Sequence, residues 1–516
     1  MSETLYGPVV AENATRSTPK PAPPPEIKVP IKSIEVSGST LLTPQEISSI
    51  TSGYIGKEIQ LDTLKDVAVQ ITGLYRKKGY LLARAFVPPQ DIQNGVVEID
   101  VVEGKIGKID VEGNKHYSSD FIRYYFSPAA RRGVSEDFER ALVLLNEFPD
   151  LHVRAFLKPG GKQGTTDVLL KVEDSEPSHG QLDYNNFGNP LVGRNRFGFE
   201  YWHGSLSGRG DLLDARMVVP VPTNNESPFY QAYYTTPISP SGAKLTGSFA
   251  SADIRVGQDL QVLDIRGTAQ IYGFTFTQPL SRTTTGGSDF TASFYAKNVS
   301  NFFLTSFLTS RDRLRELALG FDRQWATDTA RDFLTSSVTQ GLGTFMGGMM
   351  RGDPLASRVG ADDSFTKANV ELVHIQRVFT NKYLLLHGTA QYSLSPLAIT
   401  EQFALGGPDS VRGYEQSEFL GDSGWTASAE FRVPMTANTD VNSLQTAFFV
   451  DTGYMTLRNA LPGSVSKKQL TGGGVGLRAG LGKSTSLRID LGFPISPSKN
   501  LSNELPVLYA QFSKQF

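Results

Sequence analysis

The chain has 516 residues, a formal net charge of −2 and 20% charged residues, which excludes the electrostatics of a strongly basic nucleic-acid-binding protein. It contains no cysteine and six histidines, and neither His-Glu-x-x-His nor Cys-x-x-Cys spacing occurs, so no zinc site is indicated. We therefore expect no metal, no cofactor, no catalytic residue, no small-molecule substrate and no nucleic-acid partner.

Residues 1–30 form a polar, proline-rich tail. The run from Pro19 to Pro25 has a composition that stays extended and buries little apolar surface, so we expect a linker. The first residues show neither a basic segment nor an apolar segment, so a signal peptide is not present in this sequence.

An internal repeat follows the tail. The segment Ile34–Gly38 is echoed by Ile109–Gly113, and the segment Val97–Glu103 is echoed by Asp167–Glu173. The echo predicts two similar modules in tandem, each with the order strand, helix, helix, strand, strand.

The two modules are expected over residues 31–104 and 105–177, as small α+β domains. In the first, Thr43 and Glu46 form a capping box around Pro44, and helical spacing of apolar residues follows from Leu61. In the second, Ser135-Glu136-Asp137 opens a helix whose apolar face carries Phe138, Leu142 and Leu145.

Residues 178–516 are rich in glycine and aromatic residues, and they alternate in polarity. Val475, Leu477 and Ala479 are apolar and lie on one parity, whereas Arg478 lies on the other. A period of two is that of a strand with one apolar face and one charged face. The chain has no apolar run of the ~18 residues that a spanning helix needs, so a membrane crossing would be made by strands. At ~10 residues per strand, this region accommodates about sixteen strands.

Two short motifs stand out in this region. The first follows Gly406-Gly407 and comprises Val411, Arg412, Gly413 and Tyr414. The second comprises Phe449, Asp451 and Gly453. The strand around the second motif has apolar residues on one parity and Asp451 on the other, so we expect its carboxylate to face a barrel lumen.

These features make the chain resemble the two-partner secretion translocators of the haemolysin/haemagglutinin secretion-activation type. The resemblance covers about residues 30–516 and rests on the Val-Arg-Gly-Tyr and Phe-x-Asp-x-Gly signatures. It implies a transmembrane antiparallel β-barrel of about sixteen strands in the bacterial outer membrane, preceded by two periplasmic polypeptide-transport-associated (POTRA) domains. It also implies a plug loop around residues 400–424 that folds into the barrel.

The resemblance further implies that Arg412 on the loop tip meets Asp451 on the barrel wall. A planar guanidinium can bind a carboxylate by two hydrogen bonds, and a narrow lumen screens that pair less than bulk water does. Gly413 would allow a sharp turn, and Tyr414 would pack on the wall. Glu430 is an alternative partner, and four more charges are expected to line a wet lumen: Arg432, Arg478, Arg488 and Asp490.

The implied function is export of an unfolded partner protein that meets the POTRA domains in the periplasm, without ATP or covalent chemistry. The candidate docking element is an edge strand that Pro88-Pro89 would end. Its residues are Leu81, Leu82, Ala83, Arg84, Ala85, Phe86 and Val87. A proline at Arg84 is expected to abolish docking there.

The same residues are compatible with several different roles. The modules could be spacers, and the strand near Arg84 could be ordinary sheet without a ligand. The chain could also be an insertase for outer-membrane barrels or a porin, although two modules and the tyrosine at 414 favour the secretion branch. The segment Gly480–Thr485 resembles a phosphate loop, but position 477 is leucine where the first glycine is required.

Overall fold

The computed structural model describes residues 28–80, 82–92, 94–132, 136–162, 164–221, 228–257, 263–304, 307–435, 442–497 and 505–516. Contacts divide the chain into two compact units, Met1–Gly104 and Lys105–Phe516. The expected proline-rich tail lies outside the described residues up to position 27, as does Ser135 at the start of an expected helix.

The first unit is a small α+β module. Its sheet has the order β2-β5-β4, in which β2 and β5 are parallel and β4 pairs with β5 only, so β4 is an edge strand. Thr43 and Glu46 form the expected capping box, with Pro44 at the first helical position. The elements are β1 (Lys28–Pro30), β2 (Ser33–Ser37), α1 (Pro44–Thr51), η1 (Ser52–Tyr54), β3 (Glu58–Gln60), α2 (Leu61–Lys77), β4 (Arg84–Phe86) and β5 (Val96–Val102).

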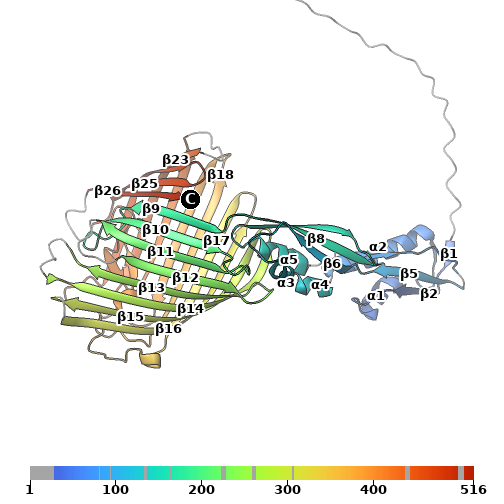
Figure 1. Cartoon of the computed structure of the whole chain (residues 1–516), viewed down its shortest axis with the longest axis horizontal. Helices are drawn as coiled ribbons and strands as arrows, with labels where there is room; N and C mark the ends of the chain where they lie inside the picture. The colour runs from blue at the N-terminus through green and yellow to red at the C-terminus, as the bar shows by residue number, and fades with distance from the viewer. Residues whose placement is uncertain are drawn as a thin grey trace, which may run out of the picture. The chain divides into compact units, whose positions relative to one another are not determined.

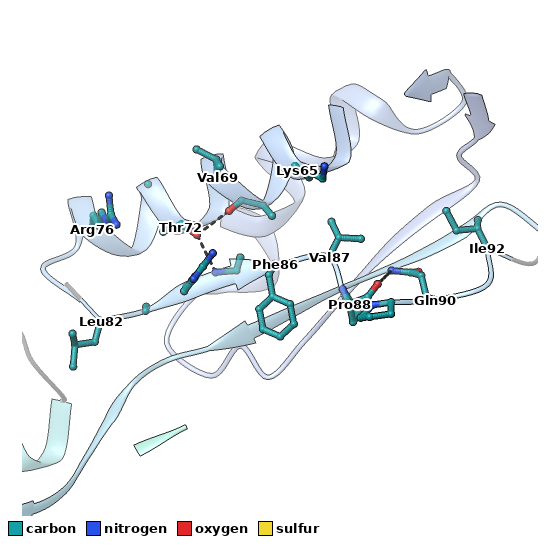
Figure 2. Close-up of a pocket in the computed structure, with 16 residues that line it drawn as sticks. Lys65, Val69, Thr72, Arg76, Leu82, Phe86, Val87, Pro88, Gln90 and Ile92 are labelled. Atoms are coloured by element: carbon teal, nitrogen blue, oxygen red, sulfur yellow. Dashed lines mark hydrogen bonds between the residues drawn. The ribbon is translucent and has the colours of Figure 1, made fainter. Parts of the chain in front are cut away.

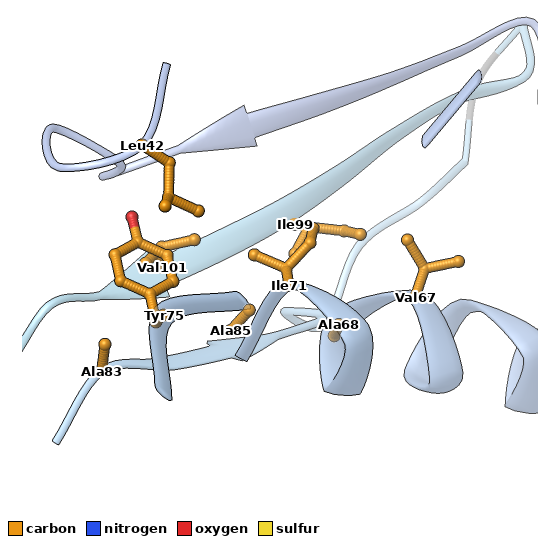
Figure 3. Close-up of a cluster of buried hydrophobic side chains, with 9 residues drawn as sticks. All are labelled: Leu42, Val67, Ala68, Ile71, Tyr75, Ala83, Ala85, Ile99 and Val101. Atoms are coloured by element: carbon orange, nitrogen blue, oxygen red, sulfur yellow. The ribbon is translucent and has the colours of Figure 1, made fainter. Parts of the chain in front are cut away.

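The core of this unit lies between helix α2 and the sheet (Figure 3). Ile71 and Tyr75 of the helix and Ile99 of the central strand are fully buried. Residues spaced three and four apart on the helix thus form one apolar face, as the sequence periodicity predicts. The opposite face of α2 remains exposed, with Val69 at 67%.

The second module repeats the same fold at the start of the second unit. Its parallel strands are β6 and β8, and β7 lies at the edge. No helix in the described residues of the chain is long and apolar enough to cross a membrane. The elements are β6 (Lys105–Glu112), α3 (Ser119–Tyr125), α4 (Ser127–Arg132), α5 (Glu136–Leu145), β7 (Leu151–Pro159) and β8 (Thr165–Asp174).

Equivalent glycines show how the repeat is built. Gly38 and Gly113 both have a positive φ, and a Cβ at either would overlap a carbonyl oxygen, that of Val101 or Val172. When the β2–β5 and β6–β8 pairings are superposed on these two glycines, Glu103 of the first module corresponds to Asp174 of the second. The alignment of Glu103 with Glu173 expected from the sequence is wrong by one residue, because identical side-chain type is weaker evidence than register.

In each module, the corresponding carboxylate, Glu103 or Asp174, binds the loop that follows the positive-φ glycine, Gly38 or Gly113. Glu103 accepts hydrogen bonds from the backbone N–H of Thr40 at 2.6 Å and of Leu41 at 2.7 Å, and from the Tyr75 hydroxyl at 2.9 Å. Asp174 accepts them from the N–H groups of three consecutive residues, Lys115, His116 and Tyr117. A carboxylate at the end of the last strand thus holds the loop that leads into the first helix of each module.

The second module contacts turns at one end of the barrel. The N–H of Ser118 donates to the carbonyl of Gly208 at 2.9 Å, in the turn between β10 and β11. Arg140 donates to the carbonyl of Pro279 at 2.8 Å, near the turn between β14 and β15. These contacts define a module end of the barrel and an opposite, far end.

The remainder of the second unit is a closed antiparallel barrel of sixteen strands, which confirms the expected fold class (Figure 1). Each strand pairs with its sequence neighbours, and β26 closes on β9. The strands are β9 (Ser178–Asn185), β10 (Asn195–Gly204), β11 (Leu212–Val221), β12 (Phe229–Pro237), β13 (Lys244–Arg255), β14 (Arg266–Thr283), β15 (Gly286–Phe303), β16 (Phe307–Ala326), β17 (Ala330–Gly341), β18 (Thr366–Val378), β19 (Lys382–Ser393), β22 (Ser423–Pro434), β23 (Asn442–Thr456), β24 (Lys467–Leu481), β25 (Thr485–Pro494) and β26 (Val507–Gln515).

Side-chain exposure separates the two faces of the wall. In β23, two apolar side chains of one parity are exposed, Phe448 at 50% and Val450 at 56%. The side chains of the other parity are buried, with Phe449 at 3% and Asp451 at 1%. The apolar parity therefore faces outward, as lipid contact requires, and the expected inward placement of Asp451 is present.

The anchoring role of Glu103 predicts a pH-dependent stability. Burial opposes ionisation of this side chain, but hydrogen bonds from Thr40, Leu41 and Tyr75 outweigh it and hold its pKa below the usual value. The stabilisation is therefore present above the unfolded-state pKa and is lost as the pH falls through the folded-state pKa. Glu103→Gln should lower the free energy of unfolding of the first unit by about 1–3 kcal/mol at neutral pH, because the amide NH2 cannot accept the hydrogen bond that one carboxylate oxygen accepts and the remaining bonds lose their charge.

Hydrogen exchange of residues 39–42 in the full chain, corrected for intrinsic rates, measures this effect. The wild-type loop should lose protection as the pH is lowered, and the variant should be poorly protected throughout. Glu58→Gln, at an exposed position of the same unit, serves as the control. Equal protection in wild type and Glu103→Gln would contradict the anchoring role.

Candidate functional site

The loop between β19 and β22 folds into the barrel. It contains η4 (Ile399–Glu401) and a short hairpin, β20 (Phe403–Leu405) with β21 (Phe419–Gly421). Its tip contacts inward-facing wall residues, and the four tip residues expected from the sequence are all buried: Val411, Arg412, Gly413 and Tyr414.

Arg412 binds the wall through its whole guanidinium group. Its Nε lies 2.7 Å from one oxygen of Asp451 and its Nη2 lies 2.9 Å from the other, which is a bidentate pair. Its Nη1 donates to Glu430 at 2.6 Å. The guanidinium also stacks 3.4 Å above the ring centroid of Phe449. Asp451 and Glu430, which are alternative partners on sequence grounds, both bind Arg412.

The backbone of Arg412 joins the same contact, since its N–H donates to Asp451 at 3.0 Å. Burial opposes the charge of Arg412, but the hydrogen bonds and charges of Asp451 and Glu430 outweigh it and raise its pKa above the ordinary value. Arg412 is 4% exposed, Asp451 1% and Glu430 2%. A buried pair of this kind is costly to break, because removal of one partner leaves an unpaired buried charge.

Further charges extend the pair into a network. Glu430 also accepts from Arg432 at 2.7 Å and from Arg478 at 3.0 Å. Asp490 accepts from Arg478 at 2.6 Å and from Arg488 at 2.8 Å. The charges expected to line the lumen also pair with one another. Arg432 and Arg488 each bind a carboxylate on their own strand, and Arg478 joins Glu430 and Asp490 across strands.

Inward-facing glycines let the loop backbone lie flat on the wall. A Cβ at Gly472 would overlap the carbonyl oxygen of Arg412, and a Cβ at Gly492 would lie 2.5 Å from the nitrogen of Gly413. A Cβ at Gly474 would lie 2.6 Å from the ring of Phe449. Sequence reasoning missed this surface, although the run Gly472-Gly473-Gly474-Val475-Gly476 was visible.

Gly413 and Tyr414 fix the turn of the tip. Gly413 has φ +102°, which favours glycine, and its N–H donates to the Tyr509 hydroxyl at 3.0 Å. The Tyr509 hydroxyl in turn donates to the carbonyl of Tyr414 at 2.6 Å. The Tyr414 hydroxyl lies 2.7 Å from the carbonyl oxygen of Thr471. Tyr509 was not singled out by sequence reasoning, because a tyrosine in a barrel strand carries no signal of its own.

The second expected motif supports the loop from the wall. Phe449 supplies the ring beneath Arg412, and Asp451 supplies the carboxylate. Gly453 makes room for the hairpin, since a Cβ there would lie 2.6 Å from a methyl group of Leu405. The two sequence motifs are therefore brought together by the fold, residue by residue.

Separate ion pairs hold the two roots of the loop. Glu401 in η4 lies 2.6 Å from Lys297 of β15 and 2.8 Å from Lys367 of β18. Asp422, just before β22, lies 2.5 Å from Arg358 and accepts the N–H of Leu397 at 2.8 Å. No sequence pattern indicates these pairs, because their members lie far apart along the chain.

The expected docking strand is at a sheet edge in the first unit, but it is shorter than expected. β4 spans only Arg84–Phe86, and Leu81 lies outside the described residues. A groove of about 1030 Å³ runs between β4 and the exposed face of α2 (Figure 2). Leu82, Phe86 and Val87 line this groove, and so do the buried residues Ala83 and Ala85.

The edge amide of β4 is already bound. The N–H of Ala85 donates to the Thr72 side chain of α2 at 2.9 Å (Figure 2). Because amides alternate in direction along a strand, those of Arg84 and Phe86 face β5. A proline at Arg84, the test expected from the sequence, would therefore break the sheet itself and could not report on docking.

Neither a metal-ion cluster nor a phosphate loop is present among the described residues. No group of three or more His, Cys, Asp or Glu side chains there could hold a metal ion. Residues Gly480–Thr485 form the end of β24, a turn and the start of β25, which is a hairpin and not a phosphate loop. The lumen site binds the loop tip by non-covalent contacts.

The inward-facing glycines predict that one added methyl group on the wall will disturb docking of the loop tip. Gly472→Ala places a Cβ against the carbonyl of Arg412 and should lift the tip off the wall, whereas Gly473→Ala places it on the outward face at ordinary contact distance, 3.4 Å or more. We expect protection of the amides of residues 411–414 from hydrogen exchange to fall at least tenfold in Gly472→Ala only. Equal protection in both variants would show that the loop does not depend on this contact.

Comparison with known proteins places this geometry in a family. The family model described as haemolysin secretion/activation protein ShlB/FhaC/HecB matches residues 164–479, more than half of the chain. The model of the POTRA domain, ShlB-type, matches residues 29–104.

Curated relatives and solved structures agree with these matches. The heme/hemopexin transporter protein HuxB of Haemophilus influenzae is 22% identical over 79% of this chain and 72% of its own length. The outer membrane transporter CdiB of Dickeya dadantii is 23% identical over 90% and 83%. The structure of CdiB from Escherichia coli, 20% identical, covers 98% of this chain and 93% of that chain with a TM-score of 0.81. The chain belongs to the haemolysin secretion/activation family of outer-membrane two-partner secretion transporters.

Proposed function

We propose that the chain exports an unfolded partner polypeptide through its barrel, without ATP and without covalent chemistry, and that the loop tip at Arg412 is the gate. The observation that carries the proposal is a loop that lies inside the barrel with its tip bound to charged wall residues by non-covalent contacts alone. A transporter of this kind needs a closed state that a substrate can open.

Opening requires energy that the partner must supply. Leaving the wall would give up the bidentate pair with Asp451, the hydrogen bond to Glu430 and the contact with Phe449 together, so the docked position is the ground state of the loop in this proposal. Shifting a two-state equilibrium from about 1:99 to 99:1 needs a differential binding energy of about 5.5 kcal/mol. An extended chain that binds the charged lumen wall in place of the loop can provide this, because Arg478 and Glu430 then gain new partners.

The partner is proposed to dock first on the module in the periplasm. The α2–β4 groove offers apolar contacts at Val69, Phe86 and Ile92 and cations at Arg76 and Arg84 (Figure 2). An extended segment with apolar side chains and some acidic ones fits this chemistry. Such a segment could also add to the edge of β4.

Strand addition at this edge involves a competition. The incoming strand would have to replace the Thr72 hydroxyl as the acceptor for the N–H of Ala85. The exchange of one hydrogen bond for another costs little net free energy, whereas an unbound edge amide would be a permanent aggregation hazard. Thr72 therefore protects the edge until a partner arrives.

The groove predicts where a partner can be captured. A photo-crosslinking amino acid at Val69, which is 67% exposed on α2, should give a covalent adduct with one secreted protein in the native host. The same amino acid at Ile55, 47% exposed in the same unit but outside the groove, is the control and should give no such adduct.

The adduct identifies the partner only if secretion of that protein also depends on this chain. A protein that forms the adduct and disappears from the medium when the chain is deleted supports export through this barrel. Adducts of equal yield at both positions, or secretion unchanged by the deletion, would overturn the docking site or the export function respectively.

A further inference from the structure

Strand β16 carries an outward-facing row of cations. Asp312 and Glu316 face inward, each 1% exposed, whereas Leu317 and Leu319 face outward at 43% and 49%. Positions 311, 313 and 315 have the same parity as Leu317 and Leu319, so they also face outward, and they lie closer to the far end of the barrel. They are occupied by Arg311, Arg313 and Arg315.

Spacing puts this row at the edge of a hydrocarbon layer. Arg323 follows Arg313 by ten positions on the same face, and the outward residues next after Arg315 are apolar, at Leu317, Leu319 and Phe321. Ten residues rise about 33 Å along a strand, or about 25 Å along the membrane normal at a tilt of about 40°. This equals the height of about 25 Å of the apolar band of such barrels, so both arginines lie at headgroup level.

The arginines differ in what holds them. Arg315 is 8% exposed, and its N–H groups bind Asn298 and the carbonyls of Leu314, Lys297 and Met346. Arg311 and Arg313 form no ion pair with any described residue, and the Nε of Arg313, which is buried, has no hydrogen-bond partner there. By contrast, Arg323 at the module end lies 5.4 Å from the ring of Trp325.

An apolar turn lies beside the row. In η3 (Phe345–Gly347) the side chains of Phe345 and Met346 are 53% and 64% exposed, and Phe345 contacts the outward-facing ring of Phe294 at 6.3 Å. Arg315 ties this turn to the wall through the Met346 carbonyl at 3.2 Å. The surface therefore combines two guanidinium groups with exposed apolar side chains below and beside them.

We propose that Arg311 and Arg313 bind the phosphate headgroup of a lipid of the outer leaflet, with its acyl chains along Leu317, Leu319 and Phe294. Guanidinium groups bind phosphate by paired, charge-assisted hydrogen bonds, and basic clusters at the membrane surface recognise anionic lipids. The inference rests on the proposed function, which puts the module end of the barrel in the periplasm and the far end outside. Its role would be to fix the barrel wall on which Glu401 holds one root of the plug loop, through Lys297 of the neighbouring strand.

The test measures binding of diphosphorylated lipid A to the purified full chain in detergent, by native mass spectrometry. We expect the double variant Arg311→Gln with Arg313→Gln to bind at least tenfold more weakly than wild type. Arg323→Gln, the same change on the same face at the module end, should change affinity less than twofold. Retained heat-modifiable mobility in electrophoresis shows that each variant barrel is folded.

A second arm keeps the test informative if the double variant does not fold. Wild-type chain should bind lipid A without phosphates at least tenfold more weakly than the diphosphorylated form. Equal binding of both forms, or equal binding by the folded double variant, would overturn the proposal. Displacement of the lipid by millimolar inorganic phosphate would also overturn it and identify a free-anion site. No partner protein is used, so failure here leaves crosslinking at Val69 as a separate test of export.

Discussion

The burial of one arginine against two carboxylates constrains the rest of this barrel. Arg412 is nearly inaccessible, and its five N–H donors and planar shape demand acceptors in a fixed geometry. Asp451 and Glu430 supply them from adjacent strands, and Arg478 and Arg432 balance the second carboxylate in turn. A loop tip that carries a charge into the lumen is stable only there, so the network selects one docked position.

Shape complements charge at this site. The loop backbone approaches the wall closely at two inward positions that lack a Cβ, Gly472 and Gly492, and Gly474 makes room for the ring of Phe449 beneath Arg412. Gly413 and the Tyr509 hydroxyl complete the fit from the loop side and from the last strand. The tip is thus held by the wall strands, while Glu401 and Asp422 hold the roots.

Sequence patterns were sufficient for the architecture and for the central pair. Alternation in strands such as β23 and β24 determined which side chains face inward, and the resemblance to two-partner secretion translocators implied that Arg412 meets Asp451. The extension through Arg478 and Asp490 could not be predicted, since it depends on cross-strand register that a single sequence does not contain. The binding of the Ala85 amide by Thr72 was missed for a similar reason, because helix and strand meet only through tertiary packing. The repeat was recognised, but its register was set by Gly38 and Gly113 and not by the carboxylates that looked alike.

The central claim is that the Arg412 network keeps the pore closed. Planar-bilayer conductance of wild type, Arg412→Ala, Asp451→Ala and the double variant tests it most directly, because current reports the open lumen. The account predicts small, flickering currents for wild type, larger and longer openings for either single variant, and no further increase in the double variant, since both substitutions remove the same contact. A large, steady wild-type current that none of the substitutions changes would contradict it.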